Sequence, residues 1–82
     1  MDHRIIQIQT ALGTDDLEAI LVETKEGWTA NLLPRPGYSM GGATTGATAE
    51  EALEKLTELA QRMYEEQVRR EVELYGPHPA PS

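Results

Sequence analysis

Adjacent carboxylates are the first residues of this 82-residue chain whose type and spacing could support chemistry. They occur as Asp15-Asp16, Glu50-Glu51 and Glu65-Glu66. General acid–base catalysis needs carboxylates that converge in a pocket, where the surroundings tune their pKa values. Each pair also has a structural use, because the first suits a turn, the second a helix start and the third a helix surface. We therefore expect no catalytic residues and no enzymatic activity.

Nucleophiles and metal ligands are sparse in the sequence. The chain has no cysteine, so neither a disulfide nor a thiolate metal site can form. His3 and His78 lie near opposite ends, whereas a zinc site needs several clustered ligands. Neither Ser39 nor Ser82 has both a histidine and an aspartate nearby in sequence. The composition thus predicts no metal site and no cofactor.

The stretch PRPGYSMGGATTGATAEEAL, residues 34–53, is glycine-rich and runs into a helix start, as phosphate-binding loops do. Such loops often carry a lysine after the last glycine, but Ala47 follows Gly46 here. Glu50 and Glu51 also place negative charge where a phosphate would bind. The stretch is better interpreted as a structural elbow that leads into the helix.

An exposed recognition spot is predicted beside the Pro-Gly turn of this stretch. Arg35 and Tyr38 are its main candidates, because arginine and tyrosine are frequent interface anchors. Met40 is a third candidate partner-binding residue. Tyr38 could instead cover a sheet edge, and Trp28 is expected to lie in the core.

Three strands and one long helix must position these residues. Alternating side chains predict strands over residues 4–12, 17–24 and 28–33, with turns at 13–16 and 25–27 and a positive φ at Gly27. Residues 38–45 are expected to form a short edge strand or an extended crossing. These elements indicate an α+β fold, a three- to four-stranded antiparallel sheet with one long helix packed across one face. Within each strand, the alternation places every second residue on the same face. The three sets are Ile6, Ile8, Thr10 and Leu12 in the first strand, Leu17, Ala19 and Leu21 in the second, and Trp28, Ala30 and Leu32 in the third.

The helix has the clearest signals in the sequence. Thr48 and Glu51 have the spacing of a capping box, and apolar residues follow at helical spacing. The helix should end before Gly76, so residues 1–76 are predicted to form one domain and 77–82 a disordered Pro-rich tail. Pairs of glutamate and base four residues apart are expected on its solvent side, namely Glu51–Lys55, Glu58–Arg62, Glu65–Arg69 and Glu66–Arg70.

Such a helix should extend beyond the sheet. About 26 residues span ~39 Å, whereas a strand of about seven residues spans ~23 Å. Past Met63 the apolar residues continue on a rotated face, which should bury against another subunit or a partner. A helix that breaks near Glu65 and folds back is the alternative. The predicted oligomer interface consists of Tyr64, Val68, Val72 and Tyr75.

The charge limits the kinds of partner. Fourteen acidic against seven basic residues give a net charge of −7, which disfavours binding to nucleic acid or anionic membranes and suits a basic partner. No segment resembles a signal peptide, and no run of ~18 apolar residues is present. We expect a cytoplasmic protein without membrane contact.

The order of motifs resembles the HicB antitoxin family over about residues 17–65. The strand WTANLL, the turn PRPGYSMGG and the cap TGATAEEALEKL carry the resemblance. Its matching residues are Trp28, Pro34, Pro36, Gly37, Gly46, Thr48, Glu51, Ala52 and Leu53.

The resemblance implies a small sheet with a helix packed across it and no catalytic residues. It also implies an antitoxin-type function, in which the protein oligomerises, as a dimer or higher, and occludes a small basic toxin. Many members carry a C-terminal DNA-binding segment, but residues 64–82 are too short for one, so no direct DNA binding is expected. The alternative is a homo-oligomer that sequesters a small anionic or nucleotide ligand at a subunit junction. Arg35, Tyr38, the glycine loop and His3 would then hold the ligand.

Overall fold

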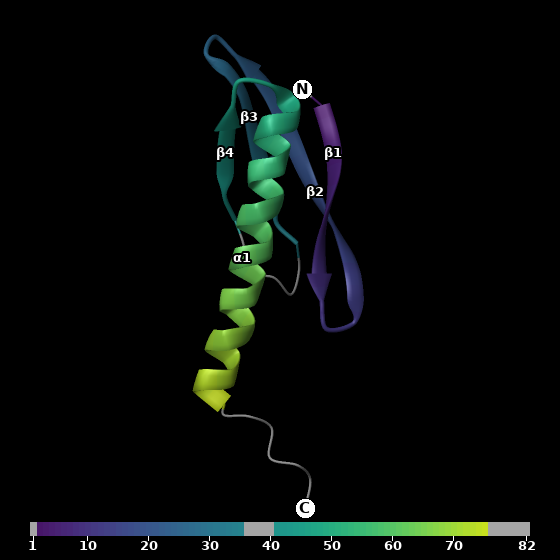
Figure 1. The fold of residues 1–82 in the computed structure, drawn as a ribbon, viewed down its shortest axis with the longest axis vertical. Coiled ribbons are helices and arrows are strands. Elements are labelled where there is room, and N and C mark those ends of the chain that lie inside the picture. The colour runs from purple at the N-terminus through teal and green to yellow at the C-terminus, as the bar shows by residue number, and fades with distance from the viewer. Residues whose placement is uncertain (1, 36–40, 76–82) are drawn as a thin grey trace, which may run out of the picture.

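The computed structural model describes residues 2–35 and 41–75, and of Tyr75 only the backbone. The elements follow in the order β1 (Asp2–Thr10), β2 (Gly13–Thr24), β3 (Gly27–Leu32), β4 (Ala43–Gly46) and α1 (Ala49–Tyr75). The strands form one antiparallel sheet in the order β1-β2-β3-β4, and α1 crosses one of its faces (Figure 1). The predicted α+β fold is confirmed, and the sheet has four strands.

The core lies between α1 and the sheet face toward it. The strand faces predicted from alternation supply it, and Trp28 packs against it while remaining half-buried. Four of its residues are alanines with no exposed surface, which lets the helix lie close to the sheet. The buried residues are Ile6, Ile8, Leu17, Ala19, Leu21, Ala30, Leu32, Ala52, Leu56 and Ala60.

Both hairpins use the same four-residue turn, TALG at 10–13 and TKEG at 24–27. In each, the threonine hydroxyl donates to the carbonyl oxygen of the glycine, at 3.3 and 3.1 Å. The same hydroxyl accepts the N–H of the residue before the glycine, at 3.2 and 3.3 Å. Each glycine has a positive φ, 122° at Gly13 and 139° at Gly27, as expected for the residue that closes such a turn.

The first turn lies earlier in the chain than predicted. The chain turns at Ala11 and Leu12, and β2 begins at Gly13, so the turn expected over residues 13–16 is wrong. Leu12, expected on the face of Ile6 and Ile8, is fully exposed in the turn. The threonine hydroxyl explains the difference, because it satisfies the turn backbone and frees the following residues to pair with β1.

The helix begins at the predicted cap. The N–H of Glu51 donates to Thr48 Oγ1 at 3.1 Å. The Glu51 carboxylate does not close the predicted capping box but lies 3.3 Å from Lys55 Nζ. All four predicted i,i+4 pairs lie on the exposed side of α1, and within the described residues this is the one pair whose charged groups are in contact. An exposed ion pair is only slightly more stable than the same two charges separately hydrated by water. Holding the two long side chains in one geometry would also cost rotamer entropy, so the other pairs stay apart.

The glycines before α1 allow close packing. A Cβ added to Gly46 would lie 2.6 Å from the backbone nitrogen of Ala52, and one added to Gly42 would lie 3.0 Å from Cδ2 of Leu59. Thr44 joins the two elements by donating to the carbonyl oxygen of Ala52 at 2.7 Å. The two glycines therefore bring β4 against the helix, which supports the structural interpretation of this part of the loop.

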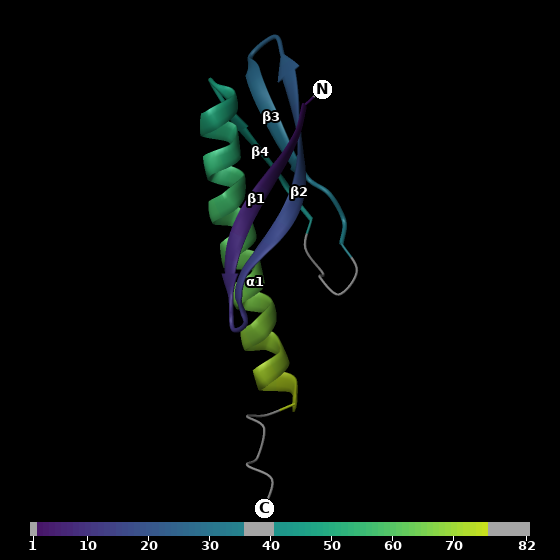
Figure 2. The ribbon, with the colours of Figure 1, turned by 90° about the vertical axis from the view of Figure 1, so that its right-hand side faces the viewer.

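The helix is continuous and extends past the sheet (Figure 2). Its 27 residues span ~40 Å. Beyond Tyr64, every described side chain of α1 except that of Gln67 is exposed. The predicted overhang is thus present, and the alternative of a break near Glu65 is wrong.

Candidate functional site

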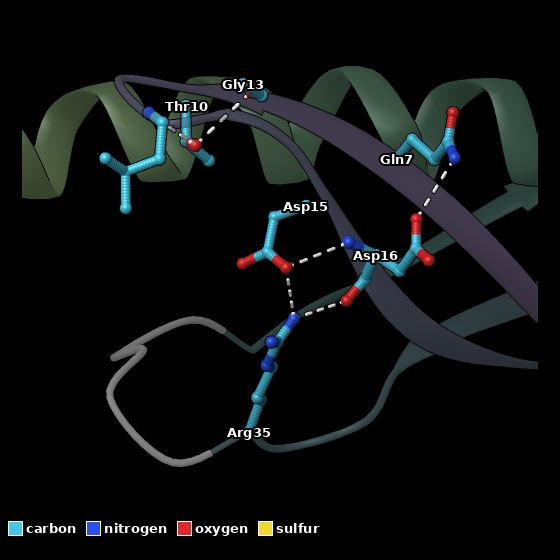
Figure 3. Close-up of polar contacts among 7 residues, drawn as sticks. Gln7, Thr10, Gly13, Asp15, Asp16 and Arg35 are labelled. Atoms are coloured by element: carbon cyan, nitrogen blue, oxygen red, sulfur yellow. Dashed lines mark hydrogen bonds and ion pairs between the residues drawn. The ribbon is translucent and has the colours of Figure 1, made fainter.

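Arg35, a predicted partner-binding residue, lies just after β3 and reaches across to β2 (Figure 3). Its Nη1 donates to Asp15 Oδ1 at 2.9 Å and to the carbonyl oxygen of Asp16. These contacts hold the segment after β3 against the β1–β2 hairpin. The guanidinium thus has a structural use, and its role toward a partner stays a prediction. Tyr38 and Met40, the other predicted partner-binding residues, lie outside the described residues.

The adjacent carboxylates of β2 have separate partners rather than a shared site. Asp16 Oδ1 accepts a hydrogen bond from Gln7 Nε2 at 3.0 Å, whereas Asp15 Oδ1 accepts from the Asp16 N–H and from Arg35. Neighbouring strand residues point to opposite faces of a sheet, which separates the two groups. In the described ranges, 2–35 and 41–75, no three metal-binding side chains cluster.

The described residues of the predicted ligand site lie far apart within one chain. His3 pairs with Ile20 at one end of β1, whereas Arg35 contacts the part of β2 that pairs with Gln7 and Ile8. Four residues of strand, ~13 Å, separate these two levels. The glycine loop continues into β4, at the opposite edge of the sheet from β1. Among the described residues of this site, a single chain therefore does not bring His3, Arg35 and the start of β4 together.

The predicted oligomer interface begins at the core and continues along the overhang. Tyr64 is half-buried and packs against the core. Val68 and Val72 follow on its side of α1 and are 40% and 47% exposed. Tyr75 is the last residue of the helix. Self-association through this stripe stays a prediction.

A side-chain amide of α1 joins the outer edge of β1. The N–H of Gln9 donates to Gln61 Oε1 at 2.6 Å, and Gln61 Nε2 donates to the Gln9 carbonyl oxygen at 3.0 Å. The amide thus makes the two bonds that a neighbouring strand would make at this position. Nothing in the sequence indicates this contact, because the two residues are 52 positions apart.

The Gln9 contact shows which backbone groups of β1 face outward. Strand residues alternate between groups that bond the neighbouring strand and groups that point to the edge. The N–H and C=O of His3, Ile5 and Gln7 therefore point to the same side as those of Gln9. Across residues 2–35 and 41–75 these groups have no hydrogen-bond partner.

A shallow, largely open groove of about 610 Å³ lies along this edge, between β1 and α1. Its apolar floor includes Ile6, which is 5% exposed, and the half-buried Leu53. Glu50 and Glu54, both exposed, form its rim on the helix side, and neither makes an ion pair with a described residue. The residues that line the groove are Ile5, Ile6, Gln7, Glu50, Leu53, Glu54 and Thr57.

A second cavity, of about 630 Å³, lies beside the β2–β3 turn and the start of α1. Lys25 and Lys55 line it, but so do Glu26 and Glu51. Lys55 is already engaged, since its Nζ also donates to the carbonyl oxygen of Thr45 at 3.1 Å. The mixed charges favour neither an anionic nor a cationic ligand.

No helix in the described part of the chain is both long enough and apolar enough to cross a membrane. Comparison with known proteins found no matching family, no matching curated protein and no matching solved structure. The resemblance to HicB antitoxins therefore stays a prediction, and function is inferred from geometry and charge.

Proposed function

We propose that this protein is a non-catalytic, HicB-like binding protein of the antitoxin type that occludes a small basic protein partner. One observation carries the proposal, namely that α1 displays carboxylates to solvent without ion-pair partners within the described residues. Three of the four glutamate–base pairs on the exposed surface of α1 are not in contact, and the helix carries eight glutamates against four basic residues, so an excess of negative charge faces solvent. The exposed carboxylates of α1 that make no ion pair with a described residue are Glu50, Glu54, Glu58, Glu65, Glu66, Glu71 and Glu73.

An excess of acidic over basic side chains on the helix surface suits recognition of a basic protein. Charges of one sign on one surface speed the encounter with an oppositely charged partner and disfavour wrong partners. The net charge of −7 acts in the same direction. Occlusion requires only that a surface covers the partner's working residues, which a domain without a catalytic constellation can do.

Capture from a lysate of the source organism is expected to recover one small basic protein in stoichiometric amount. The complex should dissociate as the NaCl concentration rises, because salt screens exposed charges. The purified partner should lose its own activity when this protein is added. A triple variant, Glu58→Gln, Glu65→Gln and Glu66→Gln, should bind more weakly and with less dependence on salt.

The matched control removes the same charge from the sheet and its turn, with Glu18→Gln, Glu23→Gln and Glu26→Gln. Equal weakening in both triple variants would show that net charge, rather than the helix face, governs binding. Recovery of a nucleotide or another small anion, with no protein, would contradict the proposal and favour a ligand-sequestering homo-oligomer.

The proposal includes self-association through Tyr64, Val68, Val72 and Tyr75. The double variant Val68→Glu and Val72→Glu should lower the mass measured by light scattering to that of a monomer, because charge would be buried at the interface. The circular dichroism spectrum should not change, since both side chains lie beyond the core. Leu74→Glu is the control, because Leu74 is 70% exposed and lies on another side of α1. An unchanged mass in the double variant would rule out this interface.

A further inference from the structure

We propose that the partner adds an extended, basic segment to the sheet as a fifth strand, along the outer edge of β1 between Asp2 and Gln7. The inference rests on the proposed function, because it specifies how a basic protein partner is held. The segment would lie in the groove between β1 and α1, beside Glu50 and Glu54.

The edge offers a regular set of backbone partners. The outward N–H and C=O groups of His3, Ile5 and Gln7 have no partner among the described residues, whereas those of Gln9 are already bonded to Gln61. A strand laid along β1 would satisfy these groups in a regular ladder. Exposed edges are usually blunted by charge, proline or a covering element, and here the Gln61 amide covers only the Gln9 level.

The Gln61 contact also sets where the added strand must stop. Six residues of β1, from Asp2 to Gln7, are open, a length of ~20 Å. An added segment of about six residues therefore fits without displacing Gln61. A longer one would have to break the 2.6 Å bond between Gln9 and Gln61.

The groove favours basic residues at alternate positions of the added strand. Side chains that point toward α1 would meet Leu53 and the two rim carboxylates. Glu50 and Glu54 are four residues apart on the helix, a rise of ~6 Å. Alternate residues of a strand are ~6.8 Å apart. Two lysines or arginines separated by one residue would thus each meet one carboxylate.

The other side of the added strand favours apolar residues. These side chains would lie on the outer face of the sheet beside Ile5, which is 58% exposed. Cross-strand contact between β-branched side chains stabilises such a pair. The preferred segment therefore alternates basic and β-branched residues.

Charge argues against a second copy of this chain on the same edge. Two β1 strands paired about a two-fold axis would bring Glu50 and Glu54 of both copies to one side of the joined sheet. Like charges held close together are destabilising. The nearby base, Arg4, does not compensate, because it lies 3.8 Å from Asp2 in an ion pair of its own. A basic segment is the better complement.

The test uses a synthetic peptide of about seven residues that alternates lysine and valine. Titration into the full-length protein, followed by NMR, should slow amide hydrogen exchange at His3, Ile5 and Gln7 and leave Gln9 unchanged. A glutamate–valine peptide of the same length should not bind. Protection of these amides without peptide, rising with protein concentration, would show that a second copy occupies the edge and would overturn the proposal.

Two variants separate the backbone contribution from the charge contribution. Ile5→Pro removes an outward N–H without removing a bond to β2, and it should weaken lysine–valine binding about tenfold. Ile5→Val keeps the N–H and should bind as the parent does. The pair Glu50→Lys and Glu54→Lys should weaken binding by about tenfold or more and leave the fold intact, which covers the case that the proline variant does not fold. Unchanged binding in the charge variants would overturn the proposal.

Failure of the strand-addition proposal can be distinguished from failure of the proposed function. If the captured basic protein binds equally to the parent, the charge variants and Ile5→Pro, and leaves the three edge amides unprotected, strand addition is wrong while the proposed function stands. If no basic protein is captured, the proposed function fails whatever the peptide does.

Discussion

Replacing Leu56 by alanine is expected to lower the free energy of unfolding by about 2–5 kcal/mol. The side chain has no exposed surface and belongs to the core between α1 and the sheet. Neighbours of Leu56 include small alanines that cannot expand to fill the space, so a cavity should remain. A domain of this size has little stability in reserve, and the variant should be partly unfolded at room temperature.

Urea denaturation followed by circular dichroism would measure this loss, and the chain supplies a matched control. Leu74 lies about five full turns further along α1, on the same side of the helix, but is 70% exposed. Leu74→Ala makes the same chemical change and should cost less than about 0.5 kcal/mol. A similar loss of unfolding free energy in the two variants would mean that Leu74, at the end of α1, is buried against other protein as Leu56 is.

Replacing Gly27 by alanine is expected to lower the free energy of unfolding by about 2–5 kcal/mol. About 1–2 kcal/mol comes from forcing a side chain to accept the positive φ of 139°. About 1–3 kcal/mol comes from overlap, because the new Cβ would lie well inside van der Waals contact with the carbonyl oxygen of Gly46. That carbonyl belongs to backbone held between β3 and α1, so it cannot move aside easily.

Gly13→Ala separates these two causes by the same denaturation measurement. Gly13 closes the first hairpin with the same turn and a φ of 122°, but a Cβ there has no atom within 4 Å. We expect a loss of about 1–2 kcal/mol, from backbone strain alone. If Gly13→Ala cost as much as Gly27→Ala, the close approach of β3 to β4 would have no energetic weight.

Local patterns in the sequence predict most of the fold. Alternation identifies the buried faces of β2 and β3, and the Thr48 cap identifies the start of α1. These features depend on neighbours within a few residues, where side-chain periodicity and backbone hydrogen bonding act directly. The first turn was misplaced by the same kind of reasoning, because a threonine hydroxyl competes with the aspartates as the turn-forming group.

The candidate site was predicted much less well than the fold. Arg35 was singled out by residue type, but its ion pair with Asp15 joins residues 20 positions apart. The extent of the open β1 edge depends on the contact between Gln61 of the helix and Gln9 of the strand, which lie 52 positions apart in the sequence. The acidic rim also depends on tertiary structure, because only the packing of α1 on the sheet places Glu50 and Glu54 beside β1.

Leu56 and Leu74 show what the sequence by itself determined and what only the tertiary structure decided. Helical periodicity places both leucines on one side of α1, and that assignment follows from the sequence alone. Only the extent of the sheet determines that the first is fully buried and the second is 70% exposed. The physical reason is range, since periodicity is set by local backbone geometry, whereas burial depends on which distant strands reach a given turn of the helix.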